Sequence, residues 1–357
     1  MKILFVGGTW NDEGGKPSSL VNKFCNALLK NEGIKKLSIY NGGNYSELEG
    51  IINKANDYNV VFWWANVPND KPKVRDVKAV NPKIMLITSK RNNGEYTTAE
   101  LINRALAVKA NLSIQFTKQS DKCFLMTVYD PLGNSWYEGT DIDSCCKLLY
   151  KRINYLRNIT RQGCKQGNEK VEIPDNKEFF DIIKGYAEVF HNLIQPEDGV
   201  TRFLGNASFR CTKGFPSFRY GDIIFVSKRN VDKRYIDKDN FVPVKLINNE
   251  VTYYGENKPS VDTPIQVRLY DKLPNINYMI HSHTYVSFAP FTDNMVPCGG
   301  LEEVKEVINT LQKNWGNLDR DLYIVNLRGH GSLIMSSNIE QLKGIKYYGR
   351  ELLEKQE

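Results

Sequence analysis

The length of the chain and the order of its apolar segments predict two α/β domains. The chain has 357 residues, and domains of about 100 to 200 residues are usual, so we expect two of them. In the first half, short apolar segments alternate with helical or mixed ones. This alternation predicts a mostly parallel, doubly wound sheet with helices on both faces.

The first expected strand, 2–6, is followed by Gly7-Gly8-Thr9, and Pro17-Ser18-Ser19 precedes an apolar periodic segment, 20–29. This order predicts strand, loop and helix. A helical segment at 141–157 ends the unit. Further strands are expected at 37–40, 60–64, 84–89, 112–116 and 124–129.

A polar stretch with little periodicity, 158–169, separates the halves. We assign 1–160 to a Rossmann-like or flavodoxin-like domain, 161–175 to a linker and 176–357 to a second domain. In the second domain we expect a helix at 176–193 and strands at 203–211, 222–227, 242–247, 276–283 and 322–325.

The first loop is a candidate anion site, because ligands of open parallel sheets bind beyond the carboxyl ends of the strands. Gly7, Gly8 and Ser18 are its candidate residues for a nucleotide or a sugar phosphate. The loop matches neither GxGxxG nor a P-loop, and glycines here also suit a simple turn. Trp63 and Trp64 either stack on a ligand ring or pack in the core.

Composition excludes several classes of protein. No signal peptide and no apolar run of ~20 residues is found, so we expect a cytoplasmic protein without membrane contacts. Seven cysteines without framework spacing predict reduced thiols. A net charge of +7 is mild and scattered, which favours a small anionic substrate over nucleic acid.

Three of the four histidines indicate a metal site. His281 and His283 lie one residue apart at the end of an apolar segment, and His330 follows later before a glycine. Two such imidazoles on a strand, completed by a third from a later strand, would hold zinc and leave a position open for substrate. The alternative is that they are ordinary histidines. His191 suits a helix C-terminus and is left outside the site.

Several motifs occur in a characteristic order: Gly205-Asn206-Ala207-Ser208, Pro259-Ser260-Val261-Asp262, His281-Ser-His283 and His330-Gly331. With them, residues 177–357 resemble the class II aldolase/adducin family, closest in motifs to its L-ribulose-5-phosphate 4-epimerase and L-fuculose-phosphate aldolase branches. The resemblance implies an α/β/α domain with a central, mostly antiparallel sheet. It also implies a homotetramer with the active site at a subunit border.

The resemblance implies a carbon-carbon lyase or epimerase that acts on a small, phosphorylated ketose through a metal-bound enediolate. Zn²⁺, or another divalent metal, would be held by His281, His283 and His330. Asp262 would move protons or become a fourth ligand, and its Asp-Thr-Pro context is similar to the epimerase branch.

Other roles are carried over from the same resemblance. Tyr348, in Tyr-Tyr-Gly, would be a proton donor and acceptor, and Asp293 corresponds less securely to an epimerase aspartate because its spacing is shorter. Val261 and the segment 227–230 depart from the family pattern. The residues expected to bind the phosphate are Gly205, Asn206, Ser227, Lys228 and Ser260.

Two alternatives stay open at this point. Aldolase, epimerase and decarboxylase chemistry are poorly separated by these motifs. A non-catalytic protein is also conceivable, either adducin-like or a ligand sensor in which the N-terminal domain binds a nucleotide or sugar nucleotide.

Overall fold

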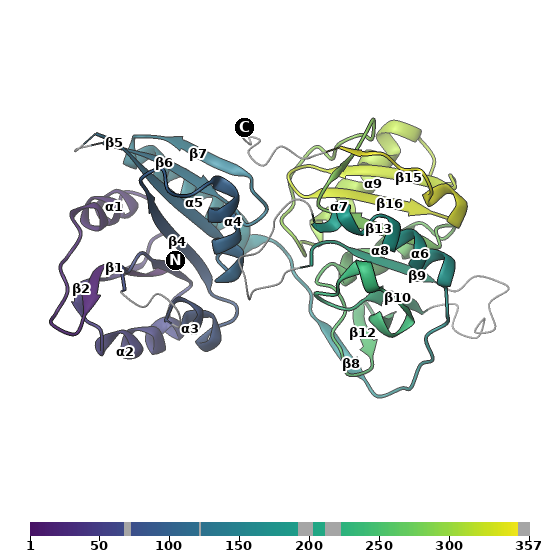
Figure 1. Cartoon of the computed structure of the whole chain (residues 1–357), viewed down its shortest axis with the longest axis horizontal. Coiled ribbons are helices and arrows are strands. Elements are labelled where there is room, and N and C mark those ends of the chain that lie inside the picture. Colours follow the sequence, from purple (N-terminus) through teal and green to yellow (C-terminus); the bar gives the residue numbers. More distant parts are fainter. Residues whose placement is uncertain (68–72, 121–122, 192–202, 211–222, 349–357) are drawn as a thin grey trace. The chain divides into compact units, whose positions relative to one another are not determined.

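The computed structural model describes residues 1–67, 73–120, 123–191, 203–210 and 223–348. These form two compact units, one ending at Asn158 and the other starting at Ile159, and each is described by itself (Figure 1). In the described part of the chain, no helix is both long and apolar enough to cross a membrane. The cysteines described there are free thiols.

The N-terminal domain is built on a seven-stranded sheet in the order β2-β1-β3-β4-β5-β6-β7. The first five strands in this order are parallel, and β6 and β7 are antiparallel. This confirms the predicted doubly wound domain. The strands are β1 (Lys2–Asn11), β2 (Lys36–Asn44), β3 (Val60–Trp63), β4 (Met85–Asn92), β5 (Leu112–Ser120), β6 (Cys123–Tyr129) and β7 (Ser135–Gly139).

Alternation along β1 explains why helices cover both faces of this sheet. Ile3 and Phe5 pack with one helix pair, whereas Leu4 and Val6 pack with another. The first pair is α1 (Ser19–Leu29) with α5 (Ile142–Asn158), and the second is α2 (Glu47–Asn53) with α3 (Lys73–Val80), which lie side by side in Figure 1. Helix α4 (Thr98–Ala107) begins with a capping box at Thr97 and Glu100.

The C-terminal domain has an eight-stranded sheet in the order β15-β16-β13-β9-β10-β11-β12-β8. All neighbours are antiparallel except β12 and β8. Strands β14 (Tyr285–Val286) and β17 (Tyr347–Tyr348) form a separate pair. The strands of the large sheet are β8 (Cys164–Gly167), β9 (Asn206–Arg210), β10 (Ile224–Ser227), β11 (Phe241–Ile247), β12 (Glu250–Tyr254), β13 (Tyr278–Ser282), β15 (Leu322–Leu327) and β16 (Gly331–Ser336).

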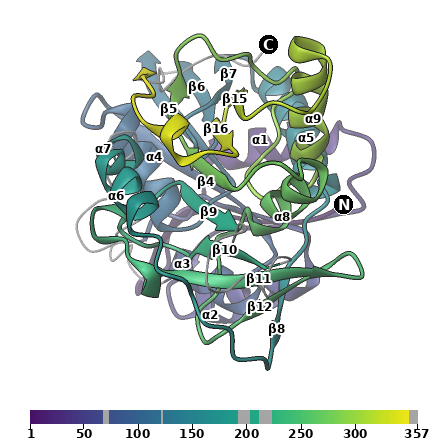
Figure 2. The same ribbon diagram turned by 90° about the vertical axis from the view of Figure 1, so that its right-hand side faces the viewer.

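Two helix pairs cover opposite faces of this sheet, as Figure 2 shows. One face packs on α6 (Lys177–Gly185) and α7 (Ala187–His191), the other on α8 (Thr263–Lys272) and α9 (Glu302–Trp315). The mostly antiparallel α/β/α arrangement implied by the family resemblance is therefore confirmed. Short 3₁₀ turns lie at Lys54–Asp57, Lys233–Tyr235, Lys238–Asn240 and Ile339–Leu342.

Two segments differ from the sequence expectations. Residues 161–175, expected to be a linker, contain β8, which extends the sheet through parallel backbone pairing with β12. The helix expected at 176–193 is divided between α6 and α7, because Gly185 and Tyr186 stand at the break and glycine weakens a helix interior. Residues 192–193, 211 and 222 of the expected elements lie outside the described residues.

Candidate metal centre

The three histidines of the C-terminal domain converge on one buried point. The ring centroids of His281 and His330 are 4.7 Å apart. The ring centroid of His283 lies 5.1 Å from that of His281 and 5.2 Å from that of His330. One ligand nitrogen from each ring lies within 4.8 Å of the others. Their exposed fractions are 3%, 7% and 0% for His281, His283 and His330. Three clustered imidazoles form a donor set that suits zinc or a similar cation.

Strand pairing produces this convergence. His281 lies in β13, where it pairs with Leu333 of β16 and with Asn206 of β9. His330 precedes β16, at a turn that passes close to the end of β13. Gly331 has φ +146°, and a Cβ there would lie 2.0 Å from the carbonyl oxygen of Ser282, so only glycine fits this approach.

The hydrogen bond of His281 orients its ring as a metal ligand. Its Nδ1 donates to the carbonyl oxygen of Ser332 at 2.9 Å, which leaves Nε2 as the nitrogen with a lone pair. Burial and the nearby His330 lower the pKa of His281 to about 4. Nε2 is buried and has no hydrogen-bond partner among the described residues. A metal ion would satisfy this nitrogen.

Glu303 orients the third histidine and was missed by the sequence analysis. The carboxylate accepts a hydrogen bond from Nδ1 of His330 at 2.8 Å. Glu303 lies in the first turn of α9 and is 4% exposed, and burial raises its pKa. A carboxylate behind a ligating imidazole is a frequent feature of zinc sites. In the sequence, only the acidic pair Glu302-Glu303 at a helix start marks it.

Asp262 is a second carboxylate close to the histidines. Its Oδ2 lies 4.0 Å from Nε2 of His281 and accepts a hydrogen bond from Asn206 at 2.9 Å. The backbone N–H of Gly299 and the thiol of Cys298 donate to Oδ1, at 3.1 and 3.3 Å. Burial and the Asp262 charge raise the pKa of Cys298 well above its ordinary value, so the sulfur keeps its proton and remains a donor.

The residues expected to bind phosphate surround Asp262. Asn206 bonds directly to it, and the backbone N–H of Asp262 donates to Oγ of Ser260 at 3.4 Å. Ser227 is fully buried, and its hydroxyl accepts from the N–H of Ala207 at 3.1 Å. Gly205 has φ +71°, and a Cβ there would lie 2.5 Å from the carbonyl oxygen of His281. Lys228 is half-buried beside them, and its backbone bridges to Pro259.

Lys233 is a buried lysine that the sequence analysis did not identify. It is 1% exposed, and its ammonium donates to the carbonyl oxygens of Phe203 and Leu204 at 3.3 and 2.9 Å. Burial lowers its pKa to about 7. These carbonyls immediately precede Gly205, so Lys233 fixes the loop that carries Asn206. A charged run in the sequence gives no signal of this burial.

Tyr348 and Asp293 are both exposed. Tyr348 is 41% exposed in β17, and its ring centroid is 5.8 Å from that of Tyr285. Gly349, the last residue of its motif, lies outside the described residues. Asp293 is exposed, and its carboxylate accepts from Lys313 at 3.1 Å. A catalytic role for either residue remains a prediction.

Some of the candidate residues of the N-terminal loop line a cavity in the N-terminal domain, and others pack against neighbouring side chains. Gly8 and Ser18 line the cavity. Gly7 instead lies against α1, where a Cβ would be 2.5 Å from a methyl group of Val21. Both tryptophans line the cavity, and both also pack in the interior: Trp63 is 5% exposed, and Trp64 packs against Phe24.

Comparison with known proteins bears on the C-terminal domain. Residues 186–354 match the family model described as Class II Aldolase and Adducin N-terminal domain. This region is a class II aldolase/adducin domain. The histidine cluster, Asp262 and Glu303 all lie within the matched region.

Solved structures similar to the chain carry low identity. One is a DNA/pantothenate metabolism flavoprotein from Streptococcus pneumoniae, with 16% identity and a TM-score of 0.36 over 44% of this chain and 99% of that one. Another is an L-fuculose 1-phosphate aldolase, with 14% identity and a TM-score of 0.32 over 48% and 84%. A third is an aldolase II superfamily protein from Pseudomonas syringae, with 12% identity and a TM-score of 0.31 over 48% and 70%. No curated protein matches the chain.

Glu303→Gln in the class II aldolase/adducin domain is expected to weaken divalent metal binding about 10- to 100-fold, the usual effect of losing an outer partner. Glutamine can still accept from His330 but removes the negative charge behind the imidazole. Zinc affinity is measured by competition with a chelator. Glu302→Gln is the matched control, because Glu302 instead accepts from the N–H of Thr160. Equal affinities in the two variants would contradict the assigned role.

Proposed function

We propose that the chain is a divalent-metal enzyme, with zinc as the expected ion, that breaks or forms a carbon-carbon bond in a small phosphorylated ketose. The observation that carries this proposal is the convergence of three buried imidazoles with the carboxylate of Asp262. The family match is consistent with it. His281, His283 and His330 would hold the metal, whose Lewis acidity would polarise the substrate carbonyl and neutralise developing negative charge.

We propose that Asp262 exchanges a proton with a substrate hydroxyl. In retro-aldol cleavage the hydroxyl loses its proton, and the bond between the hydroxyl-bearing carbon and the carbon next to the carbonyl group breaks. The electron pair of the broken bond moves toward the carbonyl oxygen, and the hydroxyl-bearing carbon becomes the aldehyde. Asp262 would accept the proton as an oriented general base. Donors from Asn206, Cys298 and Gly299 fix its carboxylate, so little reorientation is needed when substrate binds.

An anionic substrate suits the surroundings of Asp262. Asn206 and Ser260 contact Asp262, and the hydroxyl of Ser227 accepts from the N–H of Ala207, the residue after Asn206. Lys233 holds the backbone before Gly205 in place from behind. We assign the phosphate group of the substrate to this side of the site, with Lys228 as a further donor.

Aldolase and epimerase chemistry share this cleavage and differ in the fate of the aldehyde. In an aldolase the aldehyde leaves, whereas in an epimerase it rotates and recombines. Tyr348 is our proposed proton donor and acceptor for the aldehyde oxygen. Its exposure, and the position expected for it at a subunit border, are consistent with a homotetrameric assembly, which we also propose.

Proton and phosphorus NMR of the zinc-loaded protein with a panel of ketose phosphates tests this function. The panel includes L-ribulose 5-phosphate and L-fuculose 1-phosphate. Inversion at carbon 4 would identify an epimerase, and release of an aldehyde would identify an aldolase. Protein treated with a chelator should be inactive and should recover when zinc is returned. Absence of turnover and of proton exchange throughout the panel would favour a non-catalytic, adducin-like protein.

A further inference from the structure

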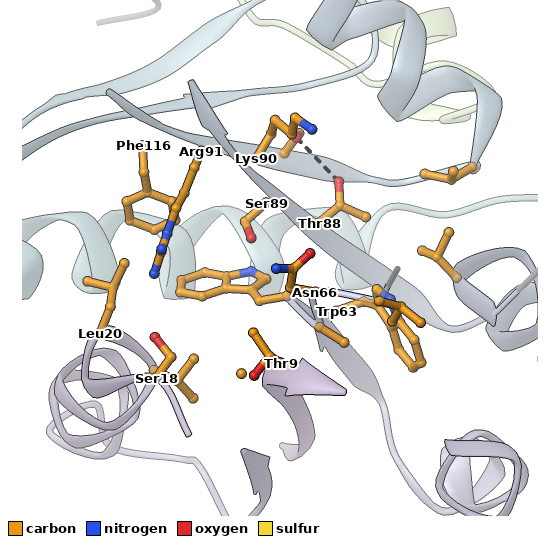
Figure 3. Close-up of a pocket in the computed structure, with 18 of the residues that line it drawn as sticks. Thr9, Ser18, Leu20, Trp63, Asn66, Thr88, Ser89, Lys90, Arg91 and Phe116 are labelled. Carbon is orange, nitrogen blue, oxygen red and sulfur yellow. Dashed lines mark hydrogen bonds between the residues drawn. The ribbon is translucent and has the colours of Figure 1, made fainter. Parts of the chain in front are cut away.

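The N-terminal domain contains a cavity of about 1010 Å³ that the proposed carbon-carbon chemistry does not use. It lies beyond the carboxyl ends of β1, β3 and β4, beside the start of α1. Strand order reverses between β1 and β3, which flank it, and ligands of doubly wound sheets bind at such a point. Figure 3 shows side chains from these strands and from the start of α1 around a common space.

The charge of the lining is entirely cationic. Among the described residues that line the cavity there is no Asp or Glu, so none of the basic groups meets a carboxylate in the lining itself. A concave surface with charges of one sign and low-dielectric walls concentrates ions of the opposite sign. The ligand should therefore be an anion. The basic lining residues are Lys16, Arg75, Lys90, Arg91 and Arg104.

Backbone and hydroxyl donors gather at one end of the cavity. Ser18 is the N-cap of α1, yet its side chain makes no capping hydrogen bond, and no acidic residue occupies the first turn. The N–H groups there and the hydroxyls of Ser18 and Ser19 are arranged as phosphate-binding helix starts commonly are. In Figure 3, Arg91 and Ser18 are directed toward the same space. Phosphate oxygens would be bound at this end.

Trp64 offers a ligand an indole N–H group and an aromatic ring, in addition to these donors. Its indole N–H is buried and has no hydrogen-bond partner among the described residues, and the residue lines the cavity. Edge contacts with Phe5, Phe24 and Phe116, at centroid distances of 4.8, 4.6 and 5.1 Å, hold the ring. A buried donor without a partner is costly, and an acceptor on the ligand would remove this cost.

We propose that this cavity binds a nucleoside phosphate. The phosphates would lie at the start of α1 with Lys16 and Arg91, and the base would lie against the apolar wall near Trp64 and Phe116. Ring nitrogens and carbonyl oxygens of a base are acceptors for the Trp64 indole. A simple sugar phosphate would satisfy the cations but would leave the apolar wall, with Leu101 and Val67, uncovered.

Isothermal titration of the full-length protein tests the proposal, with ATP, GTP, CTP and UTP as probes and with pyrophosphate and unphosphorylated nucleosides as comparisons. At least one nucleotide should bind at least about tenfold more tightly than pyrophosphate and than its own nucleoside. Lys16→Gln and Arg91→Gln should each weaken that nucleotide about tenfold, the usual loss for one charge-assisted contact. Trp64→Phe should weaken the nucleotide but not pyrophosphate.

Lys23→Gln is the matched control, because Lys23 is an exposed residue of α1 outside the cavity. It should leave nucleotide affinity unchanged. His281→Ala should also leave it unchanged, which separates this site from the metal centre. Failure of every nucleotide to bind would overturn the proposal, as would pyrophosphate binding equal to that of the tightest nucleotide. An equal loss in Lys23→Gln and Arg91→Gln would overturn it too.

Discussion

His281→Ala is expected to remove the bound divalent metal and all turnover. The substitution deletes one of three imidazole ligands, and two nitrogens from His283 and His330 cannot complete the set that a catalytic zinc site requires. The loss of affinity should exceed the roughly 10- to 100-fold penalty of removing an outer partner such as Glu303. The fold should persist, because the only hydrogen bond found for the His281 ring in the described structure goes to the carbonyl oxygen of Ser332. Loss of this hydrogen bond should lower the free energy of unfolding by about 1 to 3 kcal/mol.

Metal content of the purified protein, measured by mass spectrometry, checks this prediction together with turnover. His283→Ala should behave in the same way, since its ring centroid lies 5.1 Å from that of His281. His191→Ala is the control, because the sequence analysis leaves this fourth histidine outside the site. Full metal occupancy in the double variant of His281 and His283 would refute the ligand assignment.

The clustering of the three histidines could be predicted from the sequence because local rules determine their positions. His281 lies in β13 and His283 directly follows the end of this strand at Ser282, and alternate residues of an extended chain point the same way. His330 precedes a glycine, and a glycine permits the close approach of its turn to Ser282. The alternating segments of the N-terminal half also predicted its parallel sheet, because each strand and helix carries its own periodicity.

The groups that support the ligands could not be predicted, because they depend on tertiary contacts. Glu303 resembles any acidic residue in the first turn of a helix, and only the packing of α9 brings it to His330. Lys233 lies in a charged run, which usually indicates a solvated surface. Its burial depends on carbonyl oxygens about thirty residues earlier in the chain.

Only part of the lining of the N-terminal cavity could be predicted from the sequence. Glycines after the first strand suggested a ligand loop, but Gly7 proves to be packed against Val21. The cationic residues that characterise the cavity, such as Lys90 and Arg104, come from β4 and α4. No local pattern marks these residues, because strand order in the sheet decides which loops meet.

Asp262→Asn is expected to keep the metal and to lower turnover about 10²- to 10⁴-fold, the usual contribution of a general base. Asparagine has nearly the same shape but cannot accept a proton at neutral pH. Metal should remain because the three histidines are untouched. Metal content and kcat of the same preparation check both halves of the prediction, and Cys298→Ala, which removes one donor to Asp262, serves as a milder control.

The same substitution should also reduce the free energy of unfolding. Both carboxylate oxygens of Asp262 accept hydrogen bonds, from Asn206 on one side and from Gly299 and Cys298 on the other. An amide has one acceptor oxygen, so its NH₂ group would face a donor on one side. Asn206 cannot turn freely to accept, because its own carbonyl oxygen accepts from Gln266.

Loss of one buried acceptor costs about 1 to 3 kcal/mol, which denaturant unfolding of the metal-free protein would measure. If metal is lost with turnover, Asp262 is a fourth ligand in the resting protein. A variant that keeps both metal and full turnover would exclude Asp262 as the base. Retained metal, lost turnover and modest destabilisation would together assign its carboxylate to proton transfer.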